Sequence, residues 1–368
     1  MIYLDHNATT GIKPQVKQAV LEAMELSPLN PSSVHSAGRA ARKIIDSARA
    51  KIAEIFRAGD ADVIFTGSGT EANNLGILGV KSYNIIVSAT EHSSVMKPAK
   101  GGRVCPVDKD GLVDLKGMEK ILKNIGGKSL VSVMLANNET GVIQPIREIA
   151  ELVHSCGGII HCDAVQAAGK ISVDMRDLNI DMLSVSAHKF GGPQGIGALI
   201  VKKGMTISPV ITGGGQELGL RAGTENVAAI SGFGIAAEYM KENLDKAGEI
   251  KILRDYMERE IKSISDARIF GENGERLPNT SCLAMPGVKS EVQVIEFDLA
   301  GIAISSGSAC SSGKVAASHV LEAMGVTKTE AETAIRISLG INNTRAEIDK
   351  FIEVWKSLYE RANQRKAA

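Results

Sequence analysis

Short apolar runs alternate with longer amphipathic stretches over the first 250 residues of the chain. The runs are apolar throughout, which is typical of strands that are covered on both faces. They predict strands at Val63–Thr66, Ile85–Ser88, Leu130–Leu135, Ile159–Asp163 and Asp181–Ser186. The amphipathic stretches predict helices at Lys13–Leu26, Ala37–Phe56 and Ile146–His154. Strands separated by helices favour an α/β fold with a mostly parallel sheet, in which ligands bind at the carboxyl ends of the strands.

The pattern changes near residue 245. Two charged stretches, Gly232–Leu244 and Lys251–Ile264, predict helices. Strand-like runs follow at Ser281–Met285 and Ile335–Leu339, and a final helix is predicted over Arg345–Arg361. We therefore expect a large domain over residues 14–245 and a smaller α+β domain made of residues 1–13 and 246–368. The active site would lie at their junction.

Composition excludes several classes of function. Lys plus Arg number 42 and Asp plus Glu also number 42, so the net charge is zero and gives no case for binding nucleic acid or an anionic membrane. The first residues carry no signal-peptide pattern, and no apolar run reaches membrane-spanning length. These features predict a soluble, cytoplasmic protein.

Five cysteines are scattered without a C-x-x-C pair, which indicates neither a disulfide framework nor a zinc ribbon. Four of them lie in or beside apolar runs and are expected to be core residues: Cys105, Cys156, Cys162 and Cys282. Cys310 instead lies among serine and glycine residues, a composition typical of a loop. It is a candidate nucleophile, and the alternative is a tolerated surface thiol.

Lys189 follows the predicted strand Asp181–Ser186 in the sequence Ser-Ala-His-Lys-Phe-Gly-Gly-Pro. A lysine at the carboxyl end of such a strand suits a Schiff base with an aldehyde cofactor such as pyridoxal phosphate (PLP). A lone lysine here would more often be a surface residue in a turn. The interpretation therefore depends on what the other strand ends carry.

The strand Val63–Thr66 is followed by Gly67-Ser68-Gly69-Thr70, a glycine turn that opens a helix. Free N–H groups at the helix start, together with the Thr70 hydroxyl, can bind a phosphate. A nucleotide site is the competing interpretation, but neither G-x-G-x-x-G nor a Walker lysine is present.

Two further strand ends carry polar residues. His92 follows Ile85–Ser88 and could stack on a flat ring or move protons, although a single histidine is more often structural. Asp163 ends Ile159–Asp163 and could keep a pyridine nitrogen protonated, or could equally cap a helix. A metal site using His161 and Cys162 is disfavoured, because neighbouring strand residues point to opposite faces.

Nine stretches, in the same order, resemble the cysteine desulfurases of the class V aminotransferase family, of the NifS/IscS type. They are Tyr3–Thr10, Gly69–Asn74, Thr90–His92, Asn137–Gly141, His161–Gln166, Ser186–Lys189, Arg221–Thr224, Ser305–Cys310 and Ile335–Gly340. The resemblance covers essentially the whole chain. It implies fold type I of the PLP-dependent transferases and a homodimer.

The resemblance also implies a role for each matched residue. Lys189 would bind PLP covalently, His92 would stack on its ring and Asp163 would pair with its nitrogen. Gln166 and Asn138 would contact the side of the ring that carries the phenolic oxygen, and Arg336 would bind the substrate carboxylate. The remaining residues would hold the phosphate: Gly69, Thr70, Ser186, His188 and, from the second subunit, Thr224.

In this resemblance, the Cys310 thiolate attacks the sulfur of bound L-cysteine, leaving a persulfide on the enzyme and L-alanine as product. An acceptor protein, such as an iron–sulfur scaffold, would then take the sulfur. A selenocysteine lyase or a plain class V aminotransferase is the alternative, although a transaminase would have no use for Cys310. A non-catalytic sulfur-transfer partner is a third possibility, and it predicts loss of Lys189 or Arg336, both of which are present.

Overall fold

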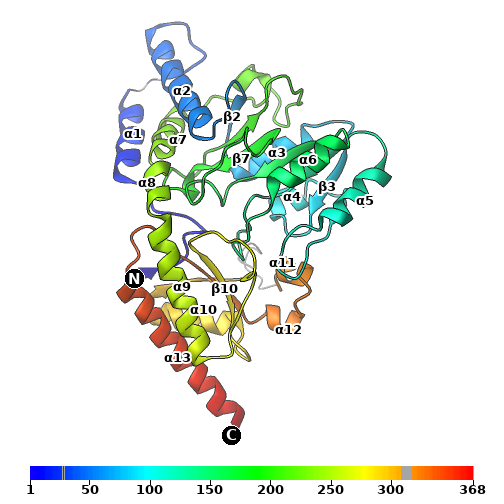
Figure 1. Ribbon diagram of the computed structural model, residues 1–368. Coiled ribbons are helices and arrows are strands. Elements are labelled where there is room, and N and C mark those ends of the chain that lie inside the picture. The colour runs from blue at the N-terminus through cyan, green and yellow to red at the C-terminus, as the bar shows by residue number, and fades with distance from the viewer. Residues whose placement is uncertain (27, 29, 308–316, 368) are drawn as a thin grey trace.

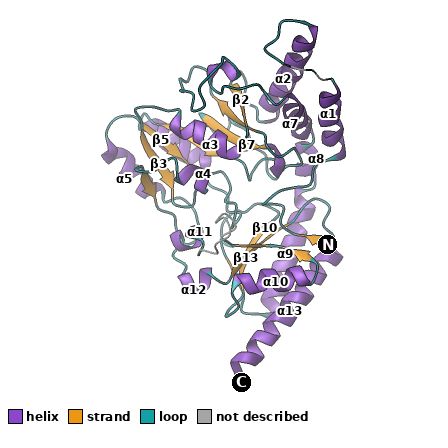
Figure 2. Cartoon of the chain, turned by 180° about the vertical axis from the view of Figure 1, so that it is seen from behind, coloured by secondary structure: helices purple, strands orange, loops and turns teal. Residues whose placement is uncertain are grey.

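The computed structural model describes residues 1–26, 28, 30–307 and 317–367. The described chain forms two regions, each built on its own sheet (Figure 1). One region holds a seven-stranded sheet with helices on both sides. The other holds a four-stranded sheet, against which the long C-terminal helix packs (Figure 2).

The seven-stranded sheet has the order β2-β8-β7-β6-β5-β3-β4. Its strands, in chain order, are β2 (Asp62–Thr66), β3 (Asn84–Ser88), β4 (Arg103–Cys105), β5 (Ser129–Ser132), β6 (Ile159–Asp163), β7 (Met182–Ser186) and β8 (Gly197–Val201). Only β8 runs antiparallel to its neighbours, so the prediction of a mostly parallel sheet is confirmed.

Two details of that sheet differ from the sequence-based expectation. The apolar pattern did not single out β4, which is an edge strand beside β3. It also did not single out β8, which lies between β2 and β7 and runs antiparallel to both. The run Leu130–Leu135 is a strand only as far as Ser132. Beyond that point, Val133 and Leu135 still donate backbone hydrogen bonds to the carbonyls of His161 and Asp163, although the ladder has ended.

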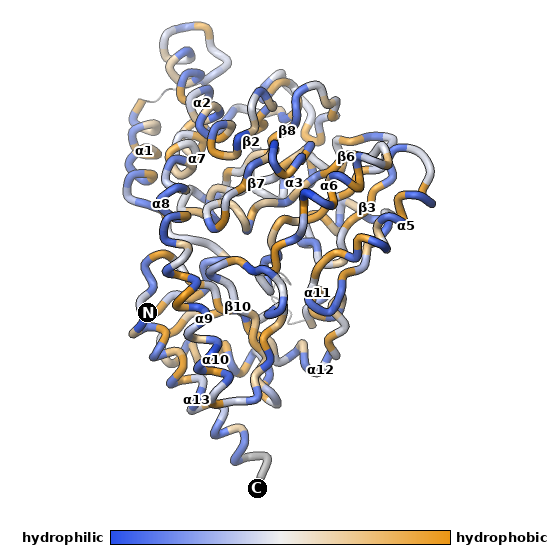
Figure 3. Tube along the Cα trace, viewed as in Figure 1, coloured by the Kyte–Doolittle hydropathy of each residue, from blue (hydrophilic) through white to orange (hydrophobic). Residues whose placement is uncertain are grey.

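Helices cover both faces of this sheet and explain why its strands are apolar throughout. The helices on one face are α1 (Pro14–Glu25), α2 (Ser36–Ile55), α5 (Leu115–Ile125), α6 (Ile146–Ser155) and α7 (Val227–Glu238). The other face is covered by α3 (Gly69–Leu78) and α4 (Ser93–Met96). Hydrophobic colouring follows the strands, whereas helices such as α2 alternate between hydrophobic and hydrophilic residues (Figure 3).

The prediction of one charged helix over Gly232–Leu244 is wrong. The chain instead forms α7, which ends at Glu238, and a separate α8 (Met240–Asp245). Helix α7 is mostly buried and packs against α1 and α2, so it carries apolar residues on most of its surface. The charged residues that follow it in the sequence belong to α8, and they hide the boundary between the two helices in the sequence pattern.

The four-stranded sheet is antiparallel with the order β12-β13-β10-β9. Its strands are β9 (Arg268–Ile269), β10 (Thr280–Ala284), β12 (Ser305–Ser306) and β13 (Ala334–Ser338). One face packs on α9 (Ala247–Ile264), α10 (Ser290–Leu299) and α13 (Arg345–Ala367), and the other on α11 (His319–Ala323) and α12 (Lys328–Ala331).

The N-terminus joins this second region, because β1 (Ile2–Tyr3) pairs in parallel with β11 (Ile302–Ala303). The buried side chains of the second region form apolar clusters separate from those around the large sheet. The domain limits at residues 13/14 and 245/246 stay a prediction. None of the helices in the described part of the chain is long and apolar enough to cross a lipid bilayer.

Candidate active site

The carboxyl ends of β2, β3, β6 and β7 meet at one edge of the large sheet and surround a cavity of about 300 Å³. Ten of the residues proposed from the sequence line it: Gly69, Thr70, His92, Asn138, Asp163, Gln166, Ser186, His188, Lys189 and Arg336. Of the other two, Thr224 is exposed and lies outside this lining, and Cys310 lies outside the described residues. The fold thus collects these ten residues from segments as far apart in the sequence as Gly69 and Arg336.

Helix α3 begins at this cavity. Ser68 caps the helix by accepting a hydrogen bond from the Glu71 amide at 3.1 Å, which leaves the first-turn N–H groups at the cavity wall. A Cβ atom on Gly69 would lie 2.9 Å from Val165 Cγ2 and 3.1 Å from Ser186 Cβ. Glycine therefore lets the turn after β2 approach the ends of β6 and β7 closely, and a compact, N–H-rich cradle results.

Asp163 places a buried carboxylate at the end of β6. Asn73 Nδ2 donates to Oδ2 at 2.6 Å, and the Val165 amide donates to Oδ1 at 2.9 Å. Neutral donors thus hold the carboxylate, and it has no ion-pair partner within the described residues. An acceptor of this kind suits a protonated ring nitrogen.

His92 is the N-cap residue of α4. Its Nδ1 lies 2.7 Å from Ser94 Oγ and accepts from the Ser94 amide at 3.1 Å. Burial lowers the pKa of His92, and the charges of Lys189, His319 and Lys97 lower it further, against an opposing effect of Asp163. The lowered pKa favours the neutral imidazole at pH 7, and the flat ring lines the cavity.

Lys189 ends the short 3₁₀ turn Ala187–Lys189 that follows β7. Its Nζ donates to the carbonyl oxygens of Asn7 at 2.6 Å and Ala8 at 2.8 Å. Neighbouring His188 contacts Thr9 Oγ1 through Nδ1 at 3.2 Å, and burial, followed by the Lys189 charge, lowers its pKa to about 4. The amine is thus aimed by backbone acceptors of the N-terminal segment.

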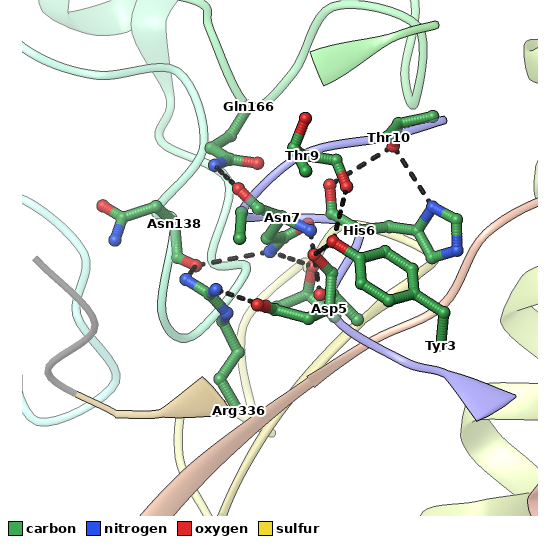
Figure 4. A network of polar contacts seen from close by, with 12 residues as sticks. Tyr3, Asp5, His6, Asn7, Thr9, Thr10, Asn138, Gln166 and Arg336 are labelled. Carbon is green, nitrogen blue, oxygen red and sulfur yellow. Dashed lines mark hydrogen bonds and ion pairs between the residues drawn. The ribbon is translucent and has the colours of Figure 1, made fainter. Parts of the chain in front are cut away.

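Arg336 enters the cavity from the four-stranded sheet. On β13 it faces away from the apolar cluster that contains Ile335 and Ile337. Its Nη2 pairs with Asp5 Oδ1 at 2.6 Å, its Nη1 donates to the Asn138 carbonyl at 3.1 Å, and its buried Nε has no hydrogen-bond partner within the described residues (Figure 4). The guanidinium therefore keeps unused N–H groups for a carboxylate ligand.

Asn7 is a site residue to which reasoning from the sequence assigned no role. It lines the cavity, its carbonyl accepts from Lys189 and from Gln166 Nε2 at 2.9 Å, and its side chain donates to Thr280 Oγ1 at 2.9 Å (Figure 4). The opening segment Tyr3–Thr10 was recognised as a matching stretch, but strand-end reasoning could not place a segment that belongs to the other region. Other lining residues to which no role had been assigned are Ala8, from the same segment, and Ser68, Asn73, Ser94, Met134, Ala136 and Val165 from the large-sheet region.

The described cysteines do not fit the role of the nucleophile at this cavity. Burial raises the thiol pKa of Cys105 to about 12 and also raises those of Cys162 and Cys282. Cys156 is partly exposed, but it caps the end of α6, three residues before β6 begins at Ile159. That position is at the edge of the sheet opposite the cavity. No cluster of three possible metal ligands occurs among the described residues.

These groups fit PLP. The glycine cradle at the start of α3 matches a phosphate, the buried Asp163 carboxylate matches a pyridine nitrogen, and Lys189 supplies an amine for the aldehyde.

Comparisons with known proteins agree with this geometry. A family model described as "Aminotransferase class-V" matches residues 2–351. The chain is 42% identical to a cysteine desulfurase of Cereibacter sphaeroides over 96% of this chain and 94% of that protein. It is 41% identical to cysteine desulfurase IscS 1 of Archaeoglobus fulgidus over 98% of this chain and 97% of that protein.

Two solved structures are also similar. A NifS-like protein from Rickettsia africae superposes with a TM-score of 0.92 at 40% identity, covering 98% of this chain and 99% of that one. A structure described as SspA in complex with cysteine superposes with a TM-score of 0.80 at 30% identity, covering 94% and 100%.

The fold and the matched model place the chain in the class V aminotransferase family, whose members use PLP. Within that family it belongs to the cysteine desulfurases, and the predicted fold type I architecture is confirmed.

Proposed function

We propose that this protein uses PLP to convert L-cysteine to L-alanine and transfers the sulfur to its own Cys310 as a persulfide. One observation carries the proposal: Lys189, Asp163, the start of α3 and Arg336 converge on a single cavity, although they come from two sheets. Its relatives across the full length are cysteine desulfurases, and the similar structure of SspA was solved with cysteine.

In the proposed reaction, bound PLP supplies an electron-accepting ring. Asp163, held by Asn73 and the Val165 amide, keeps a positive charge at the ring nitrogen favourable. Lys189 Nζ takes the Cα proton of the substrate, and the Asn7 and Ala8 carbonyls orient that nitrogen. Arg336 binds the substrate carboxylate with the N–H groups that Asp5 and Asn138 leave unused.

The sulfur step needs only one further group. The Cys310 thiolate attacks the sulfur of cysteine, the carbon–sulfur bond breaks and a sulfur–sulfur bond forms. The carbon that loses sulfur gains a proton, which balances the proton lost by the Cys310 thiol. The products are L-alanine and a persulfide on Cys310, which an acceptor protein such as an iron–sulfur scaffold would receive.

We further propose that two copies of the chain share the site. Thr224 is exposed and lies outside the cavity of its own chain. Large apolar side chains nearby in the sequence are also exposed, with Val210 at 42%, Ile211 at 43% and Leu218 at 64%. Apolar side chains beside a polar residue without a role in its own chain are typical of an interface, and they support Thr224 as a phosphate ligand in the partner's site.

Cys310→Ser tests the assignment of the nucleophile. The variant should bind PLP and L-cysteine but release no alanine, because a serine oxygen does not accept sulfur as a persulfide. Mass spectrometry of the wild type after L-cysteine should find one extra sulfur, removable by reductant, on the peptide that contains Cys310. Cys156→Ser is the matched control and should behave as wild type. Alanine production by Cys310→Ser at the wild-type rate would contradict the proposal and favour an aminotransferase or lyase.

A further inference from the structure

Lys170 is a buried lysine beside the active site, with 9% of its surface exposed and no ion pair among the described residues. It lies in the segment after β6 and lines a second cavity of about 440 Å³, which Lys189 also borders. Burial lowers its pKa well below the usual range, and the charges of Lys189 and Arg336 act in the same direction. Burying an amine without a carboxylate is costly, so its contacts require an explanation.

Within the described residues, Lys170 donates two hydrogen bonds from its side chain, and both go to side-chain amide oxygens at the active site. Its Nζ donates to Gln166 Oε1 at 2.6 Å and to Asn7 Oδ1 at 2.7 Å. A lysine amine carries N–H donors whether it is charged or neutral, so the oxygen end of each amide faces it at these distances. The oxygen of Gln166 is therefore turned to Lys170.

This fixes what Gln166 can offer to the cavity that it lines. Its Nε2 carries two N–H groups, and one of them donates to the Asn7 carbonyl at 2.9 Å (Figure 4). With Oε1 held by Lys170, the hydrogen-bonding group left for a ligand is the second N–H. Gln166 thus presents a donor and not an acceptor.

The second contact acts on Lys189 through Asn7. Lys170 and Asn279 Nδ2 (3.2 Å) both donate to Asn7 Oδ1, and the Asn7 carbonyl in turn accepts from Lys189 Nζ. The segment that aims the catalytic amine is therefore anchored by Lys170 at one of its side chains.

We propose that Lys170 is a positioning residue: it orients Gln166 so that an N–H faces the phenolic oxygen of PLP, and it anchors the Asn7 carbonyl that holds Lys189. The inference rests on the proposed function, because it needs PLP in the cavity. A lysine that only fills space between the two regions would leave the cofactor's protonation unchanged.

Lys170→Met tests the proposal, because methionine keeps the apolar stem and removes the donors. The readout is the pH midpoint at which the visible absorbance of the PLP-loaded protein titrates without substrate. Losing a donor to the anionic phenolic oxygen makes that oxygen hold a neighbouring proton more tightly, so the midpoint should rise by about one pH unit. An unchanged midpoint in the folded variant would overturn the proposal.

Lys13→Met is the matched control. Lys13 borders the same second cavity but pairs with Glu242 at 3.2 Å and does not contact Gln166 or Asn7. Its midpoint should equal that of the wild type. A rise as large as in Lys170→Met would show a general charge effect and overturn the positioning role.

Gln166→Glu gives a second test that keeps Lys170. The new carboxylate would form an ion pair with Lys170 but has no N–H, so the midpoint should rise at least as far while the melting temperature stays at or above the wild-type value. No rise would mean that Gln166 does not donate to the cofactor. If the wild type itself fails to bind PLP, the proposed function fails. If the wild type binds PLP but the variants titrate at the same pH midpoint as the wild type, only the inference about Lys170 fails.

Discussion

The seven-stranded and four-stranded sheets both supply the cavity, but they do so by different routes. In the large sheet, the site residues end strands or follow them, and neighbouring parallel strands bring their ends together as a direct result of the topology. In the smaller region, Arg336 lies within a strand, and its position depends on Asp5 and the Asn138 carbonyl from distant segments. In the proposed function, the large sheet would therefore supply the cofactor chemistry, and the smaller region would supply substrate recognition across the junction.

Lys189→Ala should have the largest effect and should fall on the chemical step. Removing the amine eliminates both covalent attachment of PLP and proton transfer at Cα, so alanine production should fall by at least about 10²–10⁴-fold. The purified wild type should be yellow, and borohydride reduction should attach PLP irreversibly to Lys189. Lys202→Ala, at a lysine with 55% side-chain exposure, should keep wild-type activity. A colourless wild type after PLP reconstitution would contradict the assignment.

Arg336→Ala should distinguish the roles of the two regions, because it should weaken cysteine binding while PLP stays bound. Losing a charge-assisted clamp should cost about 1.5–3 kcal/mol, or roughly 10–150-fold in affinity. Titration of the cofactor spectrum with L-cysteine measures the change. Arg336→Lys should recover only part of it, because lysine lacks the planar fork.

Arg268→Ala, on β9 of the same sheet, is the matched control for that titration. Arg268 pairs with Glu330 and does not line the cavity, so its removal should leave cysteine affinity unchanged. Equal affinity in Arg336→Ala and wild type would place carboxylate recognition elsewhere and remove the distinction between the two sheets.

The smallest expected effect concerns the interior of the large sheet. His161 is fully buried between Ser132 Oγ at 2.8 Å and Ser184 Oγ at 2.9 Å, and burial lowers its pKa to about 3. The unfolded chain binds a proton there below about pH 6.5, whereas the native state does not until about pH 3. His161 therefore makes the native state less stable as the pH falls from 6.5 toward 3, by up to about 1.4 kcal/mol per pH unit.

Urea unfolding between pH 7.5 and 5 measures this slope. His161→Asn should reduce the slope, whatever it does to stability at pH 7.5. His35→Asn is the control, since His35 is an exposed N-cap of α2 and asparagine also caps helices. An unchanged slope in His161→Asn would mean that the core histidine is not responsible for acid sensitivity.

Much of the large region could be predicted because local signals and topology agree there. Strands that are apolar on both faces identified β2, β3, β6 and β7, and each ends beside a polar residue. The prediction of α7 failed because a buried helix has no clear polar face and therefore shows no helical period in its sequence. The short strands β1, β9, β11 and β12 have two residues each, too few for any alternation to be visible.

The sequence by itself determined the positions of the main strands along the chain, the chemistry at their ends and the family. The tertiary structure alone decided that Asn7 contacts Lys189, that Asp5 pairs with Arg336, and that Lys170 binds Gln166. The first two pairs join residues 182 and 331 positions apart, and no local pattern encodes such a contact. Lys170 and Gln166 are only four positions apart, yet their bond matters because both are buried against the N-terminal segment. Burial, and not spacing, turned these polar side chains into a network, because inside the protein each donor must find an acceptor.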